Sequence, residues 1–322
     1  MPEAAPSVAH AIRRGPVADS ILELVGNTPL LRLHKFCPAR ALFAKLEYMN
    51  PGGSVKDRIG VGMIDAAEKA GLIRPGVSTI IEPTAGNTGV GLAIAARARG
   101  YRCILCVPTK YSREKMMLMK ALGADLVLIP KELGMKGAIA KCAELAAEIP
   151  GAYVPQQFEN PSNPDTHYHT TAEEIWNQMD GRVDAVVIGA GSGGTFTGTV
   201  KRLKELNPKI QAVLVQPVGS VFCGDPLKEW QVEGIGNGFI PGSLDLHLAD
   251  RIVDVSDADS LATARELINS EGCLVGGSSG ANAWAARKIA LELPEDSRVV
   301  TLFPDGAERY MSKQPVADLE LP

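Results

Sequence analysis

Aromatic residues make up only 5% of this 322-residue chain, and its formal net charge is −4. Neither value favours a nucleic-acid partner, because such proteins present basic surfaces or aromatic side chains on which bases stack. No apolar run reaches the roughly 20 residues of a membrane-spanning helix. The first residues lack the apolar centre of a signal peptide. We therefore interpret residues 1–17 as a disordered tail and expect a cytoplasmic protein that contacts no membrane.

Cysteine is also scarce, and six residues are too few for a disulfide scaffold. Cys103 and Cys106 have the C-x-x-C spacing of redox and zinc sites, but their flanks are typical of a buried strand. We therefore expect buried, reduced thiols. His167 and His169 form an H-x-H pair with no third ligand at metal spacing, so the sequence predicts no metal. We expect them in a polar loop that touches the substrate cleft.

Short runs of Val, Ile and Leu alternate with segments of helical period, which predicts parallel sheets with helices on both faces. A TIM barrel shares this alternation and stays open. The stretch 155–170 is polar and rich in Pro and Asn, so we expect it to cross between two lobes. The expected strands are 79–82, 103–107, 126–129, 183–188, 212–215, 251–255 and 299–302, and the expected helices are 59–70, 88–99, 113–122, 137–148, 172–178, 197–206, 260–269 and 281–291.

A glycine-rich loop follows the strand at 183–188 and opens a helix. Bare backbone lets N–H groups approach an anion, and a helix N-terminus adds positive potential, so the loop is typical of a phosphate site. Its spacing also satisfies the dinucleotide motif G-x-G-x-x-G, which needs an acidic residue at the end of the next strand. That strand ends in Gln216 and Pro217, so a monophosphate is favoured. The candidate phosphate residues are Gly189, Gly191, Ser192, Gly193, Gly194 and Thr195.

Two further loops open helices with polar side chains. Thr84, Asn87 and Thr88 lie in EPTAGNTGVG and supply hydroxyls and an amide around exposed N–H groups, which suits a substrate carboxylate. Ordinary helix capping needs only one such residue. The stretch GGSSGANAW, with Ser278 and Ser279, indicates by itself only a capped helix start.

Lys56 lies in NPGGSVKDR, where Ser54 is interpreted as the N-cap and Asp57 as the N3 residue of a capping box. The helix dipole opposes a cation in the first turn, which lowers a lysine pKa and favours a nucleophilic amine. The alternative is a surface lysine paired with Asp57 or Glu82.

Taken together, these motifs resemble the fold-type II pyridoxal-phosphate enzymes of the cysteine synthase and cystathionine β-synthase family. The resemblance runs from about Ile21 to Lys313. Its landmarks in order are VGNTPLLRL, NPGGSVKDR, EPTAGNTGVGLA, QQFENPSNPDTHYHTT, GAGSGGTFTG, VEGIGNGFIP, GGSSGAN and FPDGAERYMSK.

The resemblance implies a role for each site residue. Lys56 would hold pyridoxal 5′-phosphate as a Schiff base and move the substrate Cα proton. Asn87 would hydrogen-bond the ring oxygen, Ser278 would face the pyridine nitrogen, and Gly191–Thr195 would bind the phosphate. A serine at the nitrogen gives a weaker electron sink than an aspartate. The substrate side would be formed by Thr84, Ala85, Gly86, Thr88, Gln157 and Gly234.

The implied fold consists of two three-layer αβα domains like those of the tryptophan synthase β-subunit. Residues 54–157 would form a smaller mobile domain that carries the carboxylate loop. Residues 18–53 and 158–322 would form the larger domain that carries the phosphate loop. A homodimer is also implied.

The implied reaction is β-replacement on O-acetyl-L-serine through an aminoacrylate. Sulfide as nucleophile gives L-cysteine, and homocysteine gives L-cystathionine. Ala85 departs from the usual serine of its loop, and Glu233 in VEGIG resembles the cystathionine synthases, where a carboxylate would hold an amino-acid nucleophile. The alternatives are an amine nucleophile giving a diamino acid, a serine or threonine dehydratase, a dehydrogenase that uses NAD, and a binding protein on a decayed enzyme fold.

Overall fold

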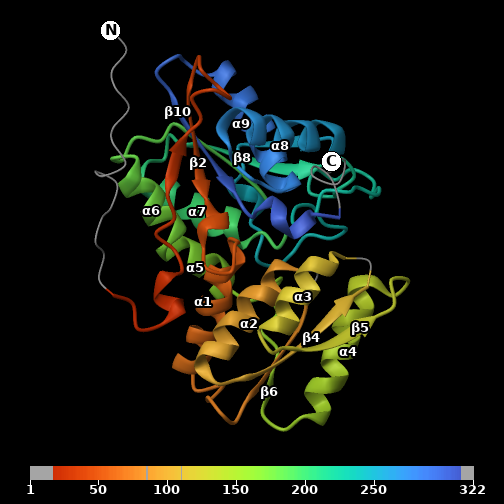
Figure 1. The fold of residues 1–322 in the computed structure, drawn as a ribbon. Coiled ribbons are helices and arrows are strands. Elements are labelled where there is room, and N and C mark those ends of the chain that lie inside the picture. Colours follow the sequence, from red (N-terminus) through yellow and green to blue (C-terminus); the bar gives the residue numbers. More distant parts are fainter. Residues whose placement is uncertain (1–16, 85, 110, 313–322) are drawn as a thin grey trace, which may run out of the picture.

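In the computed structural model, residues 17–84, 86–109 and 111–312 are described, and their strands form two separate sheets (Figure 1). The larger sheet has the order β1-β2-β10-β7-β8-β9. Strand β1 is antiparallel to β2, and all other neighbours are parallel. Its strands are β1 (Leu30–Arg32), β2 (Ala41–Leu46), β7 (Ala185–Gly189), β8 (Gln211–Pro217), β9 (Arg251–Val255) and β10 (Arg298–Phe303).

The smaller sheet has the order β5-β4-β3-β6 and is entirely parallel. Two separate sheets exclude the TIM barrel and confirm the predicted α/β fold with parallel sheets. The strands of this sheet are β3 (Thr79–Pro83), β4 (Arg102–Pro108), β5 (Asp125–Ile129) and β6 (Ala152–Tyr153).

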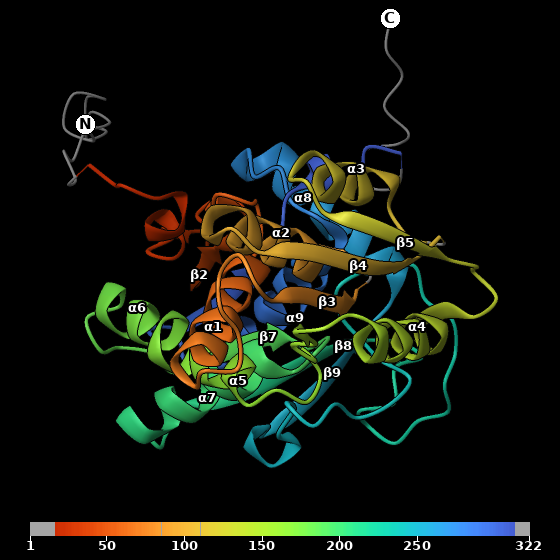
Figure 2. The same ribbon diagram turned by 90° about the horizontal axis from the view of Figure 1, so that it is seen from below.

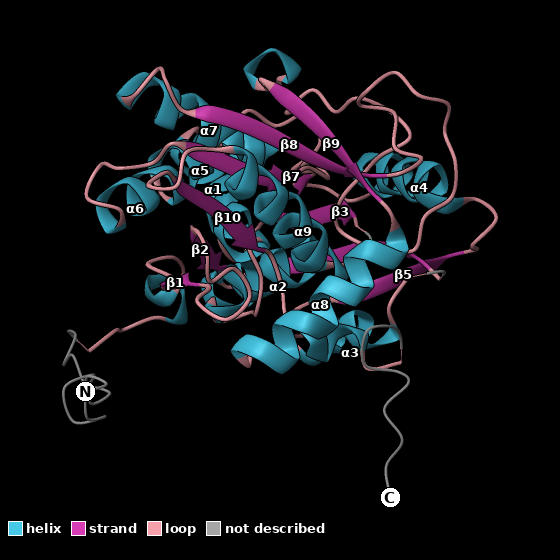
Figure 3. Ribbon diagram, turned by 90° about the horizontal axis from the view of Figure 1, so that it is seen from above, coloured by secondary structure: helices cyan, strands magenta, loops and turns pink. Residues whose placement is uncertain are grey.

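Helices enclose the strands (Figure 3). Each predicted strand and helix is present, with small differences at the ends. No helix among the described residues is long and apolar enough to cross a membrane. The helices are α1 (Lys56–Lys69), α2 (Asn87–Arg99), α3 (Arg113–Ala121), α4 (Gly134–Glu148), α5 (Ser162–His169), α6 (Thr171–Gln178), α7 (Gly194–Leu206), α8 (Asp257–Glu271) and α9 (Gly277–Glu292).

The larger sheet is buried on both faces, which explains its continuous apolar strands. On β7, Val187 packs with residues of α8 and α9, whereas Val186 and Ile188 pack with residues of α6 and α7. Because successive side chains on a strand point to opposite faces, each strand needs apolar residues at every position. The continuous apolar runs therefore identified these strands from the sequence.

In the smaller sheet, Cys103 packs in the cluster with α1 and α2, and Cys106 packs in the cluster with α4. The two thiols of the C-x-x-C motif thus lie on opposite faces of β4. The expectation of buried thiols is wrong for Cys223, which is exposed in the loop after β8, whereas the other five free cysteines are buried.

The predicted crossing loop 155–170 contains a helix, α5, so that prediction is wrong at Ser162–His169. The polar composition concealed the helix because it packs where its neighbours present glycine, and not through apolar side chains. Helix α5 lies beside α1 (Figure 2) and also packs on α7. A Cβ at Gly62 of α1 or at Gly198 of α7 would collide with α5. Glycine at these positions admits the helix.

Strands β1, β2 and β6 were not predicted, because each is short or interrupted by charge. In β2 the interruption is Lys45, which is fully buried. Its ammonium donates to the carbonyl of Thr28 at 2.6 Å and to Gln178 at 2.9 Å, and it pairs with Glu174 at 2.6 Å. A strand pattern based on apolar residues excludes such a lysine.

A buried ion network continues from this lysine and fixes the start of α1. Arg58 pairs with Glu47 at 2.7 Å and with Glu174 at 2.6 Å, and the Arg58 and Glu47 side chains are 2% and 0% exposed. Thr28 donates its hydroxyl to Glu47 at 2.6 Å. Burial raises the pKa of Glu47, but the Arg58 guanidinium outweighs it and holds that pKa below its usual range. The network places α1, and therefore Lys56, relative to β2 and α6.

We expect Glu47→Gln to lower the free energy of unfolding by about 3 kcal/mol at neutral pH, since it removes one partner of a buried pair. The lowered folded-state pKa means that the contribution of Glu47 is present above the ordinary carboxyl pKa. It is lost as pH falls through the folded-state value, so the variant and the parent should converge in acid. Urea denaturation across a pH series measures the difference.

Asp125→Asn is the control, because the Arg102–Asp125 pair is 59% and 51% exposed and such pairs contribute less than about 1 kcal/mol. An equal loss of stability in the two variants would contradict the role of the network.

Candidate active site

Lys56 is the first residue of α1, at the point where that helix approaches the larger sheet. The N-cap residue is Val55, which has no capping side chain, and the Ser54 hydroxyl accepts from the Lys56 N–H at 3.3 Å. The Asp57 carboxylate accepts from the Gly52 N–H. The predicted capping box is therefore wrong: Ser54 lies one residue before the cap, and Asp57 holds the preceding glycine loop.

A small cavity beside Lys56 brings together residues from distant parts of the sequence. Its lining includes Lys56, Gly191, Gly193, Thr195 and Gly234. The predicted lysine, phosphate loop and Gly234 thus share one cavity. The alternative, a surface lysine, does not fit this placement.

Burial lowers the pKa of Lys56 to about 8, although Asp305 and Glu47 oppose the shift. A lysine in water has a pKa of about 10.4, so the neutral amine is far more abundant here at neutral pH. Lys56 therefore combines access to a cavity with the free amine that attack on a carbonyl requires.

The start of α7 faces the same cavity. Its N-cap, Gly193, has a φ of 93° and no side chain to cap the first turn. The first helical hydrogen bond runs from the Thr197 N–H to the Gly193 carbonyl at 2.9 Å. The N–H groups before it have no helical carbonyl to bond, and they carry the positive end of the helix dipole. This arrangement suits an anion.

Side chains from α5 hold the loop Gly191–Thr195, here called the anion loop, in place. His167 lies within hydrogen-bond distance of the Thr195 hydroxyl, at 3.1 Å, and of the Thr171 hydroxyl, at 2.9 Å. Asn163 donates to the Ser192 hydroxyl at 3.1 Å. His167 is fully buried, and burial holds its pKa well below the usual value, so the ring is neutral. It is a helical residue and not the loop residue that the sequence predicted.

The predicted carboxylate loop lies at the carboxyl end of β3. The Thr84 hydroxyl accepts from the N–H groups of Gly86 and Gly89 at 3.2 and 3.1 Å, so this residue also caps α2. Thr88 donates to the Gln157 side chain at 2.6 Å, and both side chains are buried. The structure thus brings Thr84, Gly86, Thr88 and Gln157 together, whereas Ala85 lies outside the described residues.

Asn87 begins α2 and is held by two residues of the segment after β10. Its Nδ2 donates to Asp305 at 2.7 Å, and its Oδ1 accepts from Arg309 at 3.1 Å. Ser278 is buried at the start of α9. A Cβ at Gly234 would lie 3.9 Å from the Ser278 hydroxyl, so these two residues face each other.

A second buried ion pair lies beside the carboxylate loop. Lys115 of α3 pairs with Glu233 at 2.9 Å and donates to the Tyr310 hydroxyl at 2.9 Å. The same lysine packs on Gly86, where a Cβ would lie 2.7 Å from its Cδ. Tyr310 donates to Asp305 at 2.6 Å. Glu233 is therefore held by a lysine, which the sequence analysis did not predict.

Four polar residues of this region were not identified from the sequence, namely Lys115, Asp305, Arg309 and Tyr310. Three of them lie in the landmark FPDGAERYMSK, and Lys115 lies in a helix with no motif. A buried arginine can be recognised only from its partners, which are distant in sequence. The spacing of the four residues along the chain carried no signal of its own.

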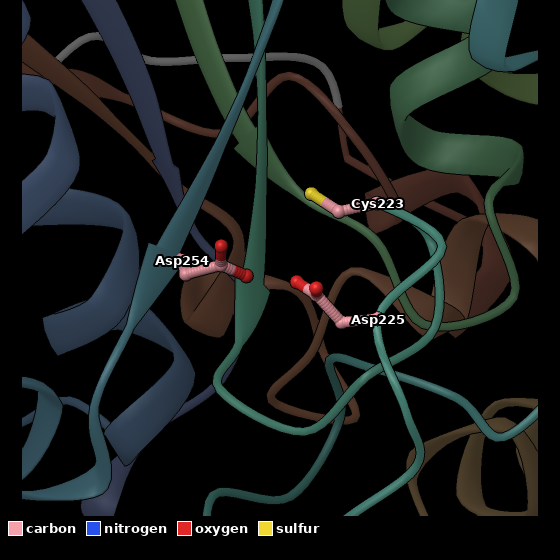
Figure 4. A group of neighbouring side chains, drawn as sticks. All are labelled: Cys223, Asp225 and Asp254. Carbon is pink, nitrogen blue, oxygen red and sulfur yellow. The ribbon is translucent and has the colours of Figure 1, made fainter.

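Among the described residues, one group of three side chains lies close enough to share a metal ion, namely Cys223, Asp225 and Asp254 (Figure 4). All three are exposed, and Asp254 accepts from Gln216 at 2.7 Å. None of them lines the cavity beside Lys56. Exposed carboxylates of this kind are common without an ion, so the group is not part of the site.

Comparison with known families shows which kind of protein contains this cavity. Residues 21–305 match the model of the family described as pyridoxal-phosphate dependent enzyme. The chain belongs to this family. The match confirms the resemblance drawn from the motifs, and it makes the protein a pyridoxal-phosphate enzyme.

Individual relatives of this pyridoxal-phosphate enzyme are similar over nearly their whole length. It is 47% identical to the O-acetylserine dependent cystathionine beta-synthase of Bacillus subtilis over 92% of this chain and 97% of the relative. It is 44% identical to a cysteine synthase of Staphylococcus aureus over 91% of this chain and 96% of the relative. The crystal structure of the O-acetylserine dependent cystathionine beta-synthase from Helicobacter pylori matches with a TM-score of 0.88 at 44% identity, covering 93% and 99% of the two chains.

The residues of this pyridoxal-phosphate enzyme fit its cofactor. The uncapped first turn of α7 offers N–H donors to a phosphate, and the amine of Lys56 faces the same cavity. Glycine is required in the loop, because a Cβ at Gly191 would collide with the Gly234 carbonyl and a Cβ at Gly193 would collide with Leu244. A compact anion site beside a lysine of lowered pKa is what a phosphorylated aldehyde needs.

We expect the amine of Lys56 in the cofactor-free protein to titrate near pH 8, as its lowered pKa requires. Competitive acetylation across a pH series, read by mass spectrometry, measures this, and exposed Lys69 of the same helix is the reference. Asp305→Asn should lower the Lys56 midpoint further, since the Asp305 carboxylate stabilises the ammonium. A midpoint equal to that of Lys69, or a rise in Asp305→Asn, would be inconsistent with this electrostatic account.

Proposed function

We propose that the enzyme catalyses β-replacement on O-acetyl-L-serine, giving L-cysteine with sulfide or L-cystathionine with homocysteine. The observation that carries the proposal is the amine of Lys56, its pKa lowered by burial, in one cavity with the uncapped start of α7. The names of the relatives support this replacement over deamination, amine addition and NAD-dependent dehydrogenation.

Each site residue has a proposed task. Lys56 carries the cofactor and moves the substrate Cα proton, and Gly191–Thr195 bind the phosphate through their N–H groups. Bound pyridoxal phosphate supplies the electron sink that allows the Cα–H bond to break and acetate to leave Cβ. Ser278 faces the ring nitrogen, and Asn87 donates to the ring oxygen. The substrate carboxylate is held by Thr84, Ala85, Gly86, Thr88 and Gln157, with Gly234 on the leaving-group side.

The Lys115–Glu233 pair favours the proposal that the second substrate is an amino acid. Glu233 precedes Gly234, which lines the cavity, and Lys115 packs on the carboxylate loop. A carboxylate and an ammonium side by side match the ammonium and carboxylate of homocysteine. Sulfide has neither group, so this pair adds nothing to its binding.

The domain organisation also remains a proposal. Residues 54–157 would form the smaller mobile domain, and all four strands of the smaller sheet lie within this range. Residues 18–53 and 158–322 would form the larger domain. A homodimer in the cytoplasm is proposed on the family resemblance.

We expect Lys56→Ala to lower turnover of O-acetylserine with either acceptor by about 10³-fold, because both the cofactor attachment and the proton-transfer base are lost. The fold should persist, since the variant removes an amine that is costly to bury. Turnover and circular dichroism test the two statements. Lys69→Ala, on the exposed end of the same helix, is the control, and full activity of Lys56→Ala would refute the assignment.

We expect Glu233→Gln to raise the KM for homocysteine by roughly 10-fold, the value of one charge-assisted hydrogen bond to an ammonium. The KM for sulfide should change by less than about threefold, since sulfide carries no ammonium. Steady-state kinetics with both acceptors measures the contrast. Glu229→Gln, an exposed glutamate of the same loop, is the control, and an equal rise for both acceptors would argue against the amino-acid site.

A further inference from the structure

The amide of Asn87 is bonded at both ends by side chains of opposite hydrogen-bonding character. The guanidinium of Arg309 donates to Oδ1 at 3.1 Å, and the carboxylate of Asp305 accepts from Nδ2 at 2.7 Å. An arginine has donors only, and an ionised aspartate has acceptors only. The two partners therefore distinguish the oxygen of the amide from its nitrogen.

A reversed amide would place its NH₂ against the guanidinium and its oxygen against the carboxylate, so both bonds would become repulsive. An asparagine between two hydroxyls or two amides would lose nothing on reversal. In this protein one orientation is chemically enforced. It leaves Nδ2 with a single hydrogen that is not committed to Asp305.

The two partners are themselves fixed. Arg309 is 2% exposed, and it also donates to the Gly53 carbonyl at 3.2 Å. Asp305 is 1% exposed and accepts from Tyr310 at 2.6 Å, while its backbone carbonyl accepts from the Gly276 N–H at 3.1 Å. Neither partner can swing away to water without breaking these bonds.

We propose that Arg309 and Asp305 are positioning residues that hold the Asn87 amide with its remaining N–H directed to the ring oxygen of the cofactor. The inference rests on the proposed role of Asn87 as donor to that oxygen. It adds that the segment after β10, and not α2 alone, sets the direction of this hydrogen bond. Arg309 and Asp305 touch neither substrate nor cofactor in this scheme.

The test is a double-mutant cycle on cofactor affinity, with Asn87→Ala, Arg309→Gln and the double variant. Each cofactor-free protein is titrated with pyridoxal 5′-phosphate and followed by visible absorption, while circular dichroism and urea denaturation report the fold. Arg309→Gln replaces a group that only donates with an amide that both donates and accepts, so the Oδ1 end of Asn87 loses its enforced partner and Asp305 alone fixes the amide. We expect each single variant to weaken binding by roughly 10-fold and to shift the balance of the absorption bands.

Because Arg309 is proposed to act through Asn87, the double variant should bind within about twofold of Asn87→Ala. Multiplied effects in the double variant, or unchanged affinity and bands in Arg309→Gln, would overturn the inference and leave the role of Asn87 intact. Unchanged affinity in Asn87→Ala would instead overturn the proposed role of Asn87 and the inference with it.

Arg309→Lys keeps the test decisive if Arg309→Gln does not fold. Lysine still only donates, so the amide should keep its orientation and the affinity should stay within about threefold of the parent protein. Loss of affinity in a folded Arg309→Lys variant, equal to that of Asn87→Ala, would contradict the proposal. The control is Arg102→Gln, which removes an exposed arginine from a surface pair.

Discussion

The proposed chemistry depends on one lysine amine whose pKa is lowered by burial, beside the positive end of a helix. Burial favours the neutral amine of Lys56, and the Asp305 carboxylate limits the shift. The start of α1 is therefore fixed on several sides: Val55 donates its N–H to the Pro304 carbonyl at 2.8 Å, and the Arg58 network ties the helix to β2 and α6. The network therefore holds the amine in place as well as stabilising the fold.

The two sheets make this arrangement possible, because the loops that follow the carboxyl ends of their parallel strands come together to form the site. Thr84 follows β3, the anion loop follows β7, and the segment with Asp305 follows β10. The hydrogen-bonded chain from Glu233 through Lys115, Tyr310 and Asp305 to Asn87 links these loops. The proposed acceptor side and the proposed cofactor side of the site thus share one set of polar contacts.

Much of this could be predicted from sequence, for physical reasons. Strands buried on both faces show as continuous apolar runs, and glycine loops before helices mark anion sites. The features that were missed are those fixed by distant partners. Helix α5 is admitted by glycines of α1 and α7, β2 contains the buried Lys45, and Arg309 is explained only by Asn87 and Gly53. The capping box failed because the helix begins after Val55, one residue later than predicted, and the Asp57 carboxylate accepts from the Gly52 N–H.

Lys56, and no other lysine, is proposed to carry the cofactor. The direct measurement is borohydride reduction of the purified protein loaded with pyridoxal 5′-phosphate, followed by proteolysis and mass spectrometry of the labelled peptide. We expect loss of the visible absorption band and a single pyridoxyl group on the peptide that contains Lys56. A label on Lys115 or another lysine, or a protein that takes up no label, would contradict it.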